Sequence, residues 1–416
     1  MKLPNTLKFT GKDKSITGSK REELLRILQR RYNIKTKMNA IDKDIYGKVP
    51  SVFIGSYGYP DVRAGFLSTE EYSHHDEPKF WSSNEREYGI PELVKLRSDM
   101  TNSSSISNVK LASRNIGSKI SDALKESSLT IKPVDAEIEI EKKPSFSLSL
   151  SPDRLPHGPS AKLRNMKITE NPKIPGFVQK IESDTDLKAA SSLELLDKKG
   201  FDEHYLTKIF SAGNLGIKEE RKLVPTKWSI TAVDDMLGKN ISKTKIQDYK
   251  ESDFKAYFGG YMGNYYFVLM LPGPWRYELF ETYVGSGLSN PREYVSATDF
   301  EGSYGRKDYA TNTVGGYYAS RLAVLKHLDM KKENSSVLVL RFITDKYWVP
   351  LGVWVVREAT RKALNQKSMD FSDIDLLIKY AKIFVMKKYN LDLDVLLKQS
   401  RLLREYKEQS SLSGFF

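Results

Sequence analysis

Apolar and polar residues are arranged along this chain in patterns that predict both strands and helices. Residues 134–141 (Val-Asp-Ala-Glu-Ile-Glu-Ile-Glu) alternate strictly, which is typical of a strand with one buried face and one carboxylate face. A solvated strand face explains such a row of acids more simply than a functional one. Compact apolar runs predict further strands at 51–55, 265–271, 275–284, 337–343 and 351–356.

Helical spacing of apolar residues occurs between these runs. We expect helices at 19–31, 184–199, 201–210, 318–328, 357–364, 372–389 and 392–407. The last of them presents a basic ridge formed by Lys398, Arg401, Arg404 and Lys407. The pattern predicts a mixed α+β fold. In its C-terminal half helices cover a sheet, and long C-terminal helices lead into a flexible tail.

Changes in composition divide the chain into four expected regions. Residues 1–50 form a basic arm with one short helix, and residues 51–165 form an α/β region with Ser- and Pro-rich segments. Residues 166–408 form the main α+β domain, and residues 409–416 form the tail.

Charge and cysteine content narrow the classes of function. The net charge is +13, and the first fifty residues hold 13 Lys/Arg against 5 Asp/Glu, which is +8 of that total. Such an arm suits a phosphate backbone, although a basic surface also serves solubility. The absence of cysteine excludes disulfides, thiolate zinc sites and a cysteine nucleophile. Without a long apolar run or a signal-peptide pattern, we expect a cytoplasmic protein with no membrane partner. The basic charge further predicts that it is associated with the nucleoid.

The last eight residues carry the most specific motif. Gln409, Leu412, Phe415 and Phe416 form the pattern Gln-x-x-Leu-x-x-Phe-Phe. It resembles the PIP box, the peptide with which replication and repair proteins dock on the sliding clamp PCNA. The amide can hydrogen-bond in a polar pocket while the apolar side chains fill a hydrophobic one. The alternative is that these apolar residues fold back as a plug on the domain.

Two segments combine aromatic rings with cations. The first contains Tyr57, Gly58 and Arg63: glycine permits a close approach to phosphate, tyrosine can stack on a base, and arginine can bind phosphate oxygens. The second contains Arg221, Lys222, Lys227 and Trp228. We interpret both as candidate nucleic-acid or nucleotide contacts. An ordinary turn with exposed tyrosines, and a core position for Trp228, are the competing interpretations.

Carboxylates are the only indication of catalysis. Asp184, Asp186, Asp234 and Asp235 are candidate ligands for Mg²⁺ or Mn²⁺, as a two-metal nuclease requires. Helix caps and surface acids explain most such pairs. The five histidines show no metal-ligand spacing, and we expect His74 and His75 to lie in a solvated loop. No P-loop, kinase, Rossmann or hydrolase motif is present, which argues against an ATPase.

Several segments together resemble the archaeal Nre family. They are residues 52–60, 183–189, 223–235, 271–275, 315–323 and 350–354, in addition to the terminal motif. The resemblance implies a DNA damage response factor that works with the clamp. Family members carry an N-terminal cysteine cluster interpreted as a zinc site, and this chain lacks it, so we expect no zinc.

These observations favour a non-motor DNA repair factor that binds DNA and is recruited to PCNA. The alternative is a metal-dependent nuclease, or another nucleotide-processing enzyme, in the same pathway. The sequence leaves open whether the protein is an enzyme.

Overall fold

The computed structural model describes residues 43–83, 87–112, 119–144, 147–285 and 295–413. These residues divide between Leu237 and Gly238 into two compact units. The division falls inside helix α8 (Thr226–Thr244). The sequence-based boundary at residue 165 falls inside strand β5 (Ser160–Ile168), which is paired on both edges. The helix expected at 19–31 and the rest of the basic arm to residue 42 lie outside the described residues.

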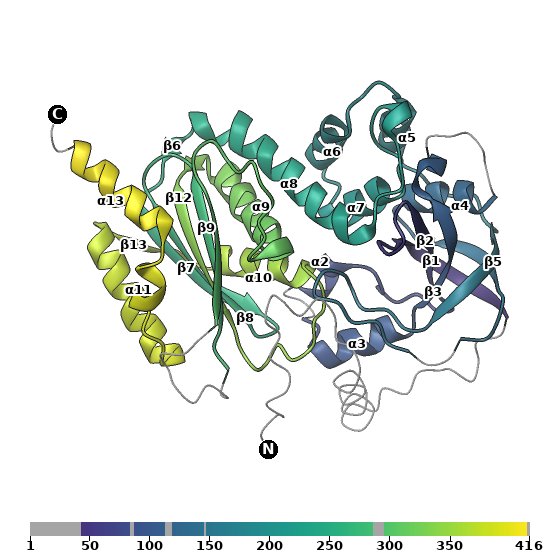
Figure 1. The fold of residues 1–416 in the computed structure, drawn as a ribbon, viewed down its shortest axis with the longest axis horizontal. Helices are drawn as coiled ribbons and strands as arrows, with labels where there is room; N and C mark the ends of the chain where they lie inside the picture. The colour runs from purple at the N-terminus through teal and green to yellow at the C-terminus, as the bar shows by residue number, and fades with distance from the viewer. Residues whose placement is uncertain (1–42, 84–86, 113–118, 145–146, 286–294, 414–416) are drawn as a thin grey trace, which may run out of the picture. The chain divides into compact units, whose positions relative to one another are not determined.

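The first unit contains a closed five-stranded barrel with the strand order β1-β2-β3-β5-β4 (Figure 1). Its strands are β1 (Asp44–Ile54), β2 (Asp61–Thr69), β3 (Thr101–Asn108), β4 (Val134–Ile140) and β5. Neighbouring strands are antiparallel except β3 and β5, which run parallel. The strands expected at 51–55 and 134–141 are therefore found as part of β1 and as β4.

Strand β4 shows how the sequence pattern closes the barrel. Its apolar residues Val134, Ala136 and Ile138 are buried in the barrel core. The alternate carboxylates point outward, and Asp135 and Glu139 form ion pairs with basic residues of the neighbouring strands β1 and β5. For example, Lys48 Nζ lies 2.6 Å from Asp135 Oδ2. The acidic row is thus a solvated strand face. Ion pairs that are exposed to this degree contribute little stability.

Helices surround the barrel in the first unit. They are α2 (Pro78–Trp81), α3 (Ile90–Ser98), α4 (Lys119–Leu129), α5 (Gly176–Ser183), α6 (Ala189–Lys198), α7 (Glu203–Ser211) and the first part of α8. Asp202 caps α7 by accepting the Tyr205 N–H at 2.8 Å. The helix expected from Asp184 begins only at Ala189, because the Asp184 side chain instead accepts the N–H groups of Asp186 and Leu187 in a turn.

The second unit is built on a six-stranded sheet with the order β10-β9-β12-β8-β7-β13. The strands are β7 (Phe254–Tyr261), β8 (Asn264–Leu271), β9 (Arg276–Tyr283), β10 (Ser296–Glu301), β12 (Ser336–Ile343) and β13 (Met369–Phe371). Only the β9–β12 pair is parallel. The central strands β8 and β12 are almost wholly buried, as their apolar runs predicted. Two-residue strands β6 (Lys250–Glu251) and β11 (Glu333–Asn334) form a separate pair.

Helices cover both faces of this sheet (Figure 1). Helices α9 (Val314–Lys331) and α10 (Trp354–Leu364) lie on one face. On the other face lie α11 (Ile374–Tyr389), α12 (Asp394–Leu397) and α13 (Arg401–Ser413), whose buried residues share a core with those of the sheet. The expected mixed α+β fold with a helix-covered C-terminal sheet is confirmed. Within the described residues, no helix combines the length and hydrophobicity needed to cross a bilayer.

Two predicted elements of the C-terminal half were wrong. Residues 351–356 do not form a strand, because α10 already begins at Trp354; a short apolar run does not distinguish a strand from a buried helix. The single helix expected at 392–407 is two helices separated at Lys398–Ser400. Arg401, Arg404 and Lys407 share α13, whereas Lys398 follows α12.

Candidate functional site

An exposed group of aromatic rings lies at one end of the barrel in the first unit. Tyr57 and Tyr59 occupy the loop between β1 and β2 and are 95% and 45% exposed. Trp228, in the first turn of α8, is 44% exposed. The Tyr59 and Trp228 ring centroids lie 5.5 Å apart at an interplanar angle of 51°. Trp228 is therefore a surface residue and not a core residue.

Backbone geometry brings these two segments together. The Ile54 N–H, at the end of β1, donates to Thr226 Oγ1 at 3.0 Å, which fixes the start of α8 beside the loop. Gly58 adopts φ +81°, and its carbonyl accepts the Asp61 N–H at 2.9 Å. This left-handed conformation suits glycine and turns both tyrosines outward at low cost.

Basic residues lie in the same two segments as the rings. Arg63 is exposed on β2 at the base of the loop, where its carbonyl accepts the Gly55 N–H at 2.7 Å. Lys222 is exposed, Lys227 is half-buried, and the segment holding them is bound to the barrel by the Leu223 N–H to Val109 carbonyl bond. We call the set Tyr57, Tyr59, Arg63, Lys222, Lys227 and Trp228 the aromatic-basic surface.

Arg221 does not belong to this surface. It is buried, and its guanidinium donates to three carbonyl oxygens, those of Gly216, Glu182 and Asp184, at 2.7 to 3.0 Å. These bonds fasten the segment before α8 to the end of α5. The expected phosphate contact by Arg221 is therefore replaced by a structural role.

The four candidate acids occupy different environments. Asp184 and Asp186 are exposed in the turn before α6, Asp234 is buried within α8, and Asp235 is half-buried. Among the residues that the structure describes, no group of three or more His, Asp or Glu side chains is placed to hold a metal ion. The metal-dependent nuclease consequently rests on the sequence pattern alone.

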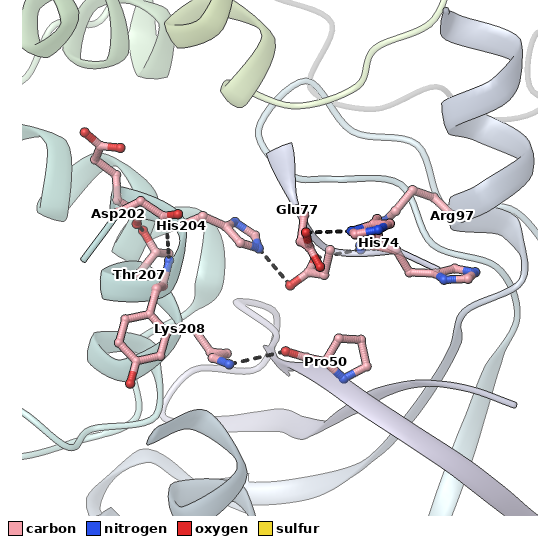
Figure 2. Close-up of polar contacts among 12 residues, drawn as sticks. Pro50, His74, Glu77, Arg97, Asp202, His204, Thr207 and Lys208 are labelled. Atoms are coloured by element: carbon pink, nitrogen blue, oxygen red, sulfur yellow. Dashed lines mark hydrogen bonds and ion pairs between the residues drawn. The ribbon is translucent and has the colours of Figure 1, made fainter. Parts of the chain in front are cut away.

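A buried cluster of charged residues lies elsewhere in the first unit (Figure 2). Asp76 occupies its centre: Oδ1 lies 2.7 Å from Arg97 Nη1, and Oδ2 lies 2.7 Å from His204 Nε2. Arg97 also donates to the Pro156 and His75 carbonyls. The cluster joins α3, α7 and the loop before α2.

Lys208 on α7 extends this cluster. Its Nζ donates to the Pro50 carbonyl at 3.3 Å (Figure 2) and to the Thr130 carbonyl at 2.8 Å. Burial lowers the pKa of Lys208 to about 8, against the opposing influence of Asp76 and Asp202. Burial alone would raise the pKa of Asp76, but the charges of His204, Arg97 and Lys208 hold it well below its usual range. The carboxylate is therefore ionised at neutral pH.

The sequence pattern did not predict this cluster, and the expected position of the neighbouring His75 was wrong. His75 is buried, 4% exposed, and does not lie in a solvated loop as expected. Its Nδ1 accepts the Ser73 N–H at 2.9 Å, and burial lowers its pKa to about 4. No local pattern signals this arrangement, since the partners of Asp76 come from α3 and α7.

The terminal motif continues α13. The backbone of Gln409 and Leu412 is helical, because α13 extends to Ser413, whereas Phe415 and Phe416 lie outside the described residues. The first turn of α13 is anchored to the sheet: Glu278 on β9 accepts the N–H groups of Arg401 and Leu402, both at 3.1 Å. The chain leading to the motif thus starts from a fixed point.

Comparisons with known proteins identify the family. The model of the archaeal Nre N-terminal region matches residues 21–290, and that of the archaeal Nre C-terminal region matches residues 301–415. No solved structure matches the chain.

Similar proteins from two archaea cover most of the chain. DNA repair protein NreA of Archaeoglobus fulgidus is 39% identical over 332 residues, covering 78% of this chain and 81% of the relative. DNA repair protein NreA of Haloferax volcanii is 34% identical, covering 78% and 79%. DNA repair protein NreB of A. fulgidus is 34% identical, covering 89% and 92%. The two family models and these relatives together show that the chain belongs to the archaeal Nre family.

Proposed function

We propose that this protein is a DNA repair factor that binds DNA through the aromatic-basic surface and is recruited to the clamp PCNA through residues 409–416. The relatives are named DNA repair proteins, which supports the pathway. The net charge of +13 supports a polyanionic partner.

The contact between Tyr59 and Trp228 carries the DNA-binding part of the proposal. Two large rings from separate segments meet at the surface and remain nearly half exposed. Exposed aromatic rings beside cations suit a nucleic acid, because the rings stack on bases while the cations contact phosphates. Arg63, at the base of the β1–β2 loop, and Lys222, in the segment before α8, supply exposed cations on the two segments that carry the rings.

Salt dependence tests this binding. The affinity of the full chain for labelled DNA should fall steeply between 50 and 200 mM salt, because binding releases counterions. The double variant Arg63→Gln/Lys222→Gln should reduce the slope of log K against log salt by about 2, one unit per lost phosphate contact. The control Lys379→Gln/Lys387→Gln removes two exposed lysines of α11 and should leave the slope unchanged. Salt-independent binding, or equal effects of both double variants, would contradict the proposal.

Clamp recruitment rests on the sequence pattern of residues 409–416 and on the anchored start of α13. In a PIP-type complex the two phenylalanines would fill an apolar pocket of the clamp and Gln409 would bind a polar one. Because buried aromatic anchors dominate peptide affinity, removing both should weaken binding by roughly a hundredfold or more.

The matched test compares Phe415→Ala/Phe416→Ala with Ser411→Ala, which changes a position between the anchors. Titration calorimetry against purified archaeal PCNA should show loss of binding for the first variant and unchanged affinity for the second. Retained affinity for PCNA in the double alanine variant would refute docking through this motif. The proposed DNA binding would still stand.

A further inference from the structure

The barrel of the first unit has a diagnostic connectivity. Five strands close in the order β1-β2-β3-β5-β4, only β3 and β5 are parallel, and helix α4 lies between β3 and β4 in the chain. This strand order, this single parallel pair and this helix position are those of the oligonucleotide- and oligosaccharide-binding (OB) barrel. The fold by itself does not determine function, so what the barrel binds depends on the residues on its surface.

The aromatic rings lie where OB barrels bind their ligands. Such barrels bind oligonucleotides across the outer face of β2 and β3 and against the β1–β2 and β4–β5 loops. Here the β1–β2 loop is the segment that presents Tyr57 and Tyr59. The β4–β5 loop reaches the same face, because His157 contacts the ring of Phe53 on β1 and lies 3.4 Å from Asn102 Nδ2 on β3.

The outer face of β2 and β3 is open at the end next to the β1–β2 loop, whereas Asn102 and Ser104, at the other end of β3, are buried. Arg63 and Ile106 are register partners on the two strands, and both are exposed, Ile106 by 65%. Val62 and Ala64, which alternate with Arg63, are buried in the barrel core. The open part therefore offers a cation and an apolar contact at the base of the loop that carries Tyr57 and Tyr59.

We propose that this barrel is an OB domain that binds single-stranded DNA, with the strand crossing Arg63 and Ile106 and unpaired bases stacking on Tyr57 and Trp228. The inference rests on the proposed DNA binding and adds the strandedness and the path of the ligand. An unpaired base exposes its flat face to a ring, whereas a duplex conceals that face by stacking its own bases. Arg63 contacts phosphate oxygens along the path.

The test measures binding of the full chain to a labelled 16-nucleotide oligothymidylate, to a duplex of equal length and to oligouridylate, by fluorescence anisotropy at fixed salt. Tyr57→Ala and Trp228→Ala should each weaken binding to oligothymidylate by roughly five- to a hundredfold. Tyr46→Ala is the matched control: Tyr46 is 67% exposed on β1 of the same barrel, opposite Glu137 of β4 and away from the β2–β3 face. It should leave binding unchanged.

A second readout does not depend on variants. Photo-crosslinking of oligonucleotides containing 5-bromodeoxyuridine should attach the base to peptides that contain Tyr57, Tyr59 or Trp228. Crosslinks confined to the second unit would overturn the inference. Tighter binding of the duplex, together with equal losses of affinity in Tyr57→Ala, Trp228→Ala and Tyr46→Ala, would also overturn the inference. The proposed DNA binding would then still stand. Tighter binding of oligouridylate would assign the barrel to RNA, and failure to bind any nucleic acid would refute the proposed DNA binding itself.

Discussion

Glu278 on strand β9 caps helix α13 by accepting the backbone N–H of Leu402 at 3.1 Å. The same carboxylate accepts the Arg401 N–H at 3.1 Å and the Ser400 hydroxyl at 2.5 Å. A side chain from the sheet thus satisfies donors that every helix leaves unpaired in its first turn. A carboxylate also suits the positive end of the helix dipole.

Removing this cap should destabilise the C-terminal helix. Glu278→Ala leaves buried N–H donors without an acceptor, and we expect a loss of about 1–3 kcal/mol in the free energy of unfolding. Limited proteolysis should show earlier cleavage after residue 400. The control Glu141→Ala removes an exposed partner of Lys162 and should cost about 0.5 kcal/mol or less. If the two variants were cleaved after residue 400 at the same rate, the capping role would be contradicted.

The Asp76–Arg97 pair provides a second prediction. Arg97→Met leaves the buried Asp76 carboxylate without its arginine and leaves two carbonyls without a donor. We expect a loss of about 3–5 kcal/mol in chemical denaturation. Arg164→Met, which breaks an exposed pair with Glu139, should cost at most about 1 kcal/mol. A small effect of Arg97→Met would mean that water or another cation compensates the carboxylate.

His75 predicts a pH dependence. Burial lowers its pKa to about 4, below the unfolded value of 6.5, so the unfolded chain takes up the proton first as pH falls. The contribution of His75 is fully present above pH 6.5, is lost between pH 6.5 and 4, and amounts to at most about 3 kcal/mol. Protonation would also remove the acceptor of the Ser73 N–H.

Urea denaturation at pH 7 and pH 4.5 measures this effect. The difference in unfolding free energy between the two pH values should be smaller in His75→Gln than in the wild type. His74→Gln is the control, because His74 lies at the surface and makes an exposed pair with Glu77. An unchanged difference in His75→Gln would assign the acid sensitivity to other groups.

Gly58 gives a prediction that separates backbone strain from a steric clash. In Gly58→Ala the added Cβ would lie 2.7 Å from the Asp61 carbonyl oxygen, in addition to the cost of a positive φ. The left-handed conformation alone costs a non-glycine residue about 1–2 kcal/mol. Gly305→Ala shares the positive φ, +77°, but its Cβ meets no atom within 4 Å. Gly58→Ala should therefore lower the unfolding free energy more than Gly305→Ala and should also weaken DNA binding. Equal effects would show that the loop adjusts freely.

Local patterns predicted the elements whose buried positions follow a regular order of apolar residues along the chain. The alternation in β4 and the apolar runs of β8 and β12 each determine a strand without reference to the rest of the chain. Strand β3 (Thr101–Asn108) gave no such signal, because it is rich in Ser and Asn, although its first four residues are buried. Its place in the barrel depends on pairing with β2 and β5.

The site was predicted in pieces. Tyr57, Arg63 and Trp228 were identified from their residue types, but their proximity depends on the bond between Ile54 and Thr226. The charged cluster was not predicted, because Asp76 finds Arg97 and His204 only in the folded unit. Arg221 resembled a phosphate contact in sequence, and only the structure shows that carbonyl groups occupy its donors.

The Ile54–Thr226 bond also has a consequence for synthesis of the chain. Its partners are 172 residues apart, so β1 leaves the ribosome long before the helix that accepts the N–H of its last residue. An N-terminal fragment ending before α8 can contain every strand of the barrel but lacks Trp228. All five strands of the barrel therefore emerge before its aromatic surface is complete, and competence to bind a strand of DNA should appear only after α8 has emerged.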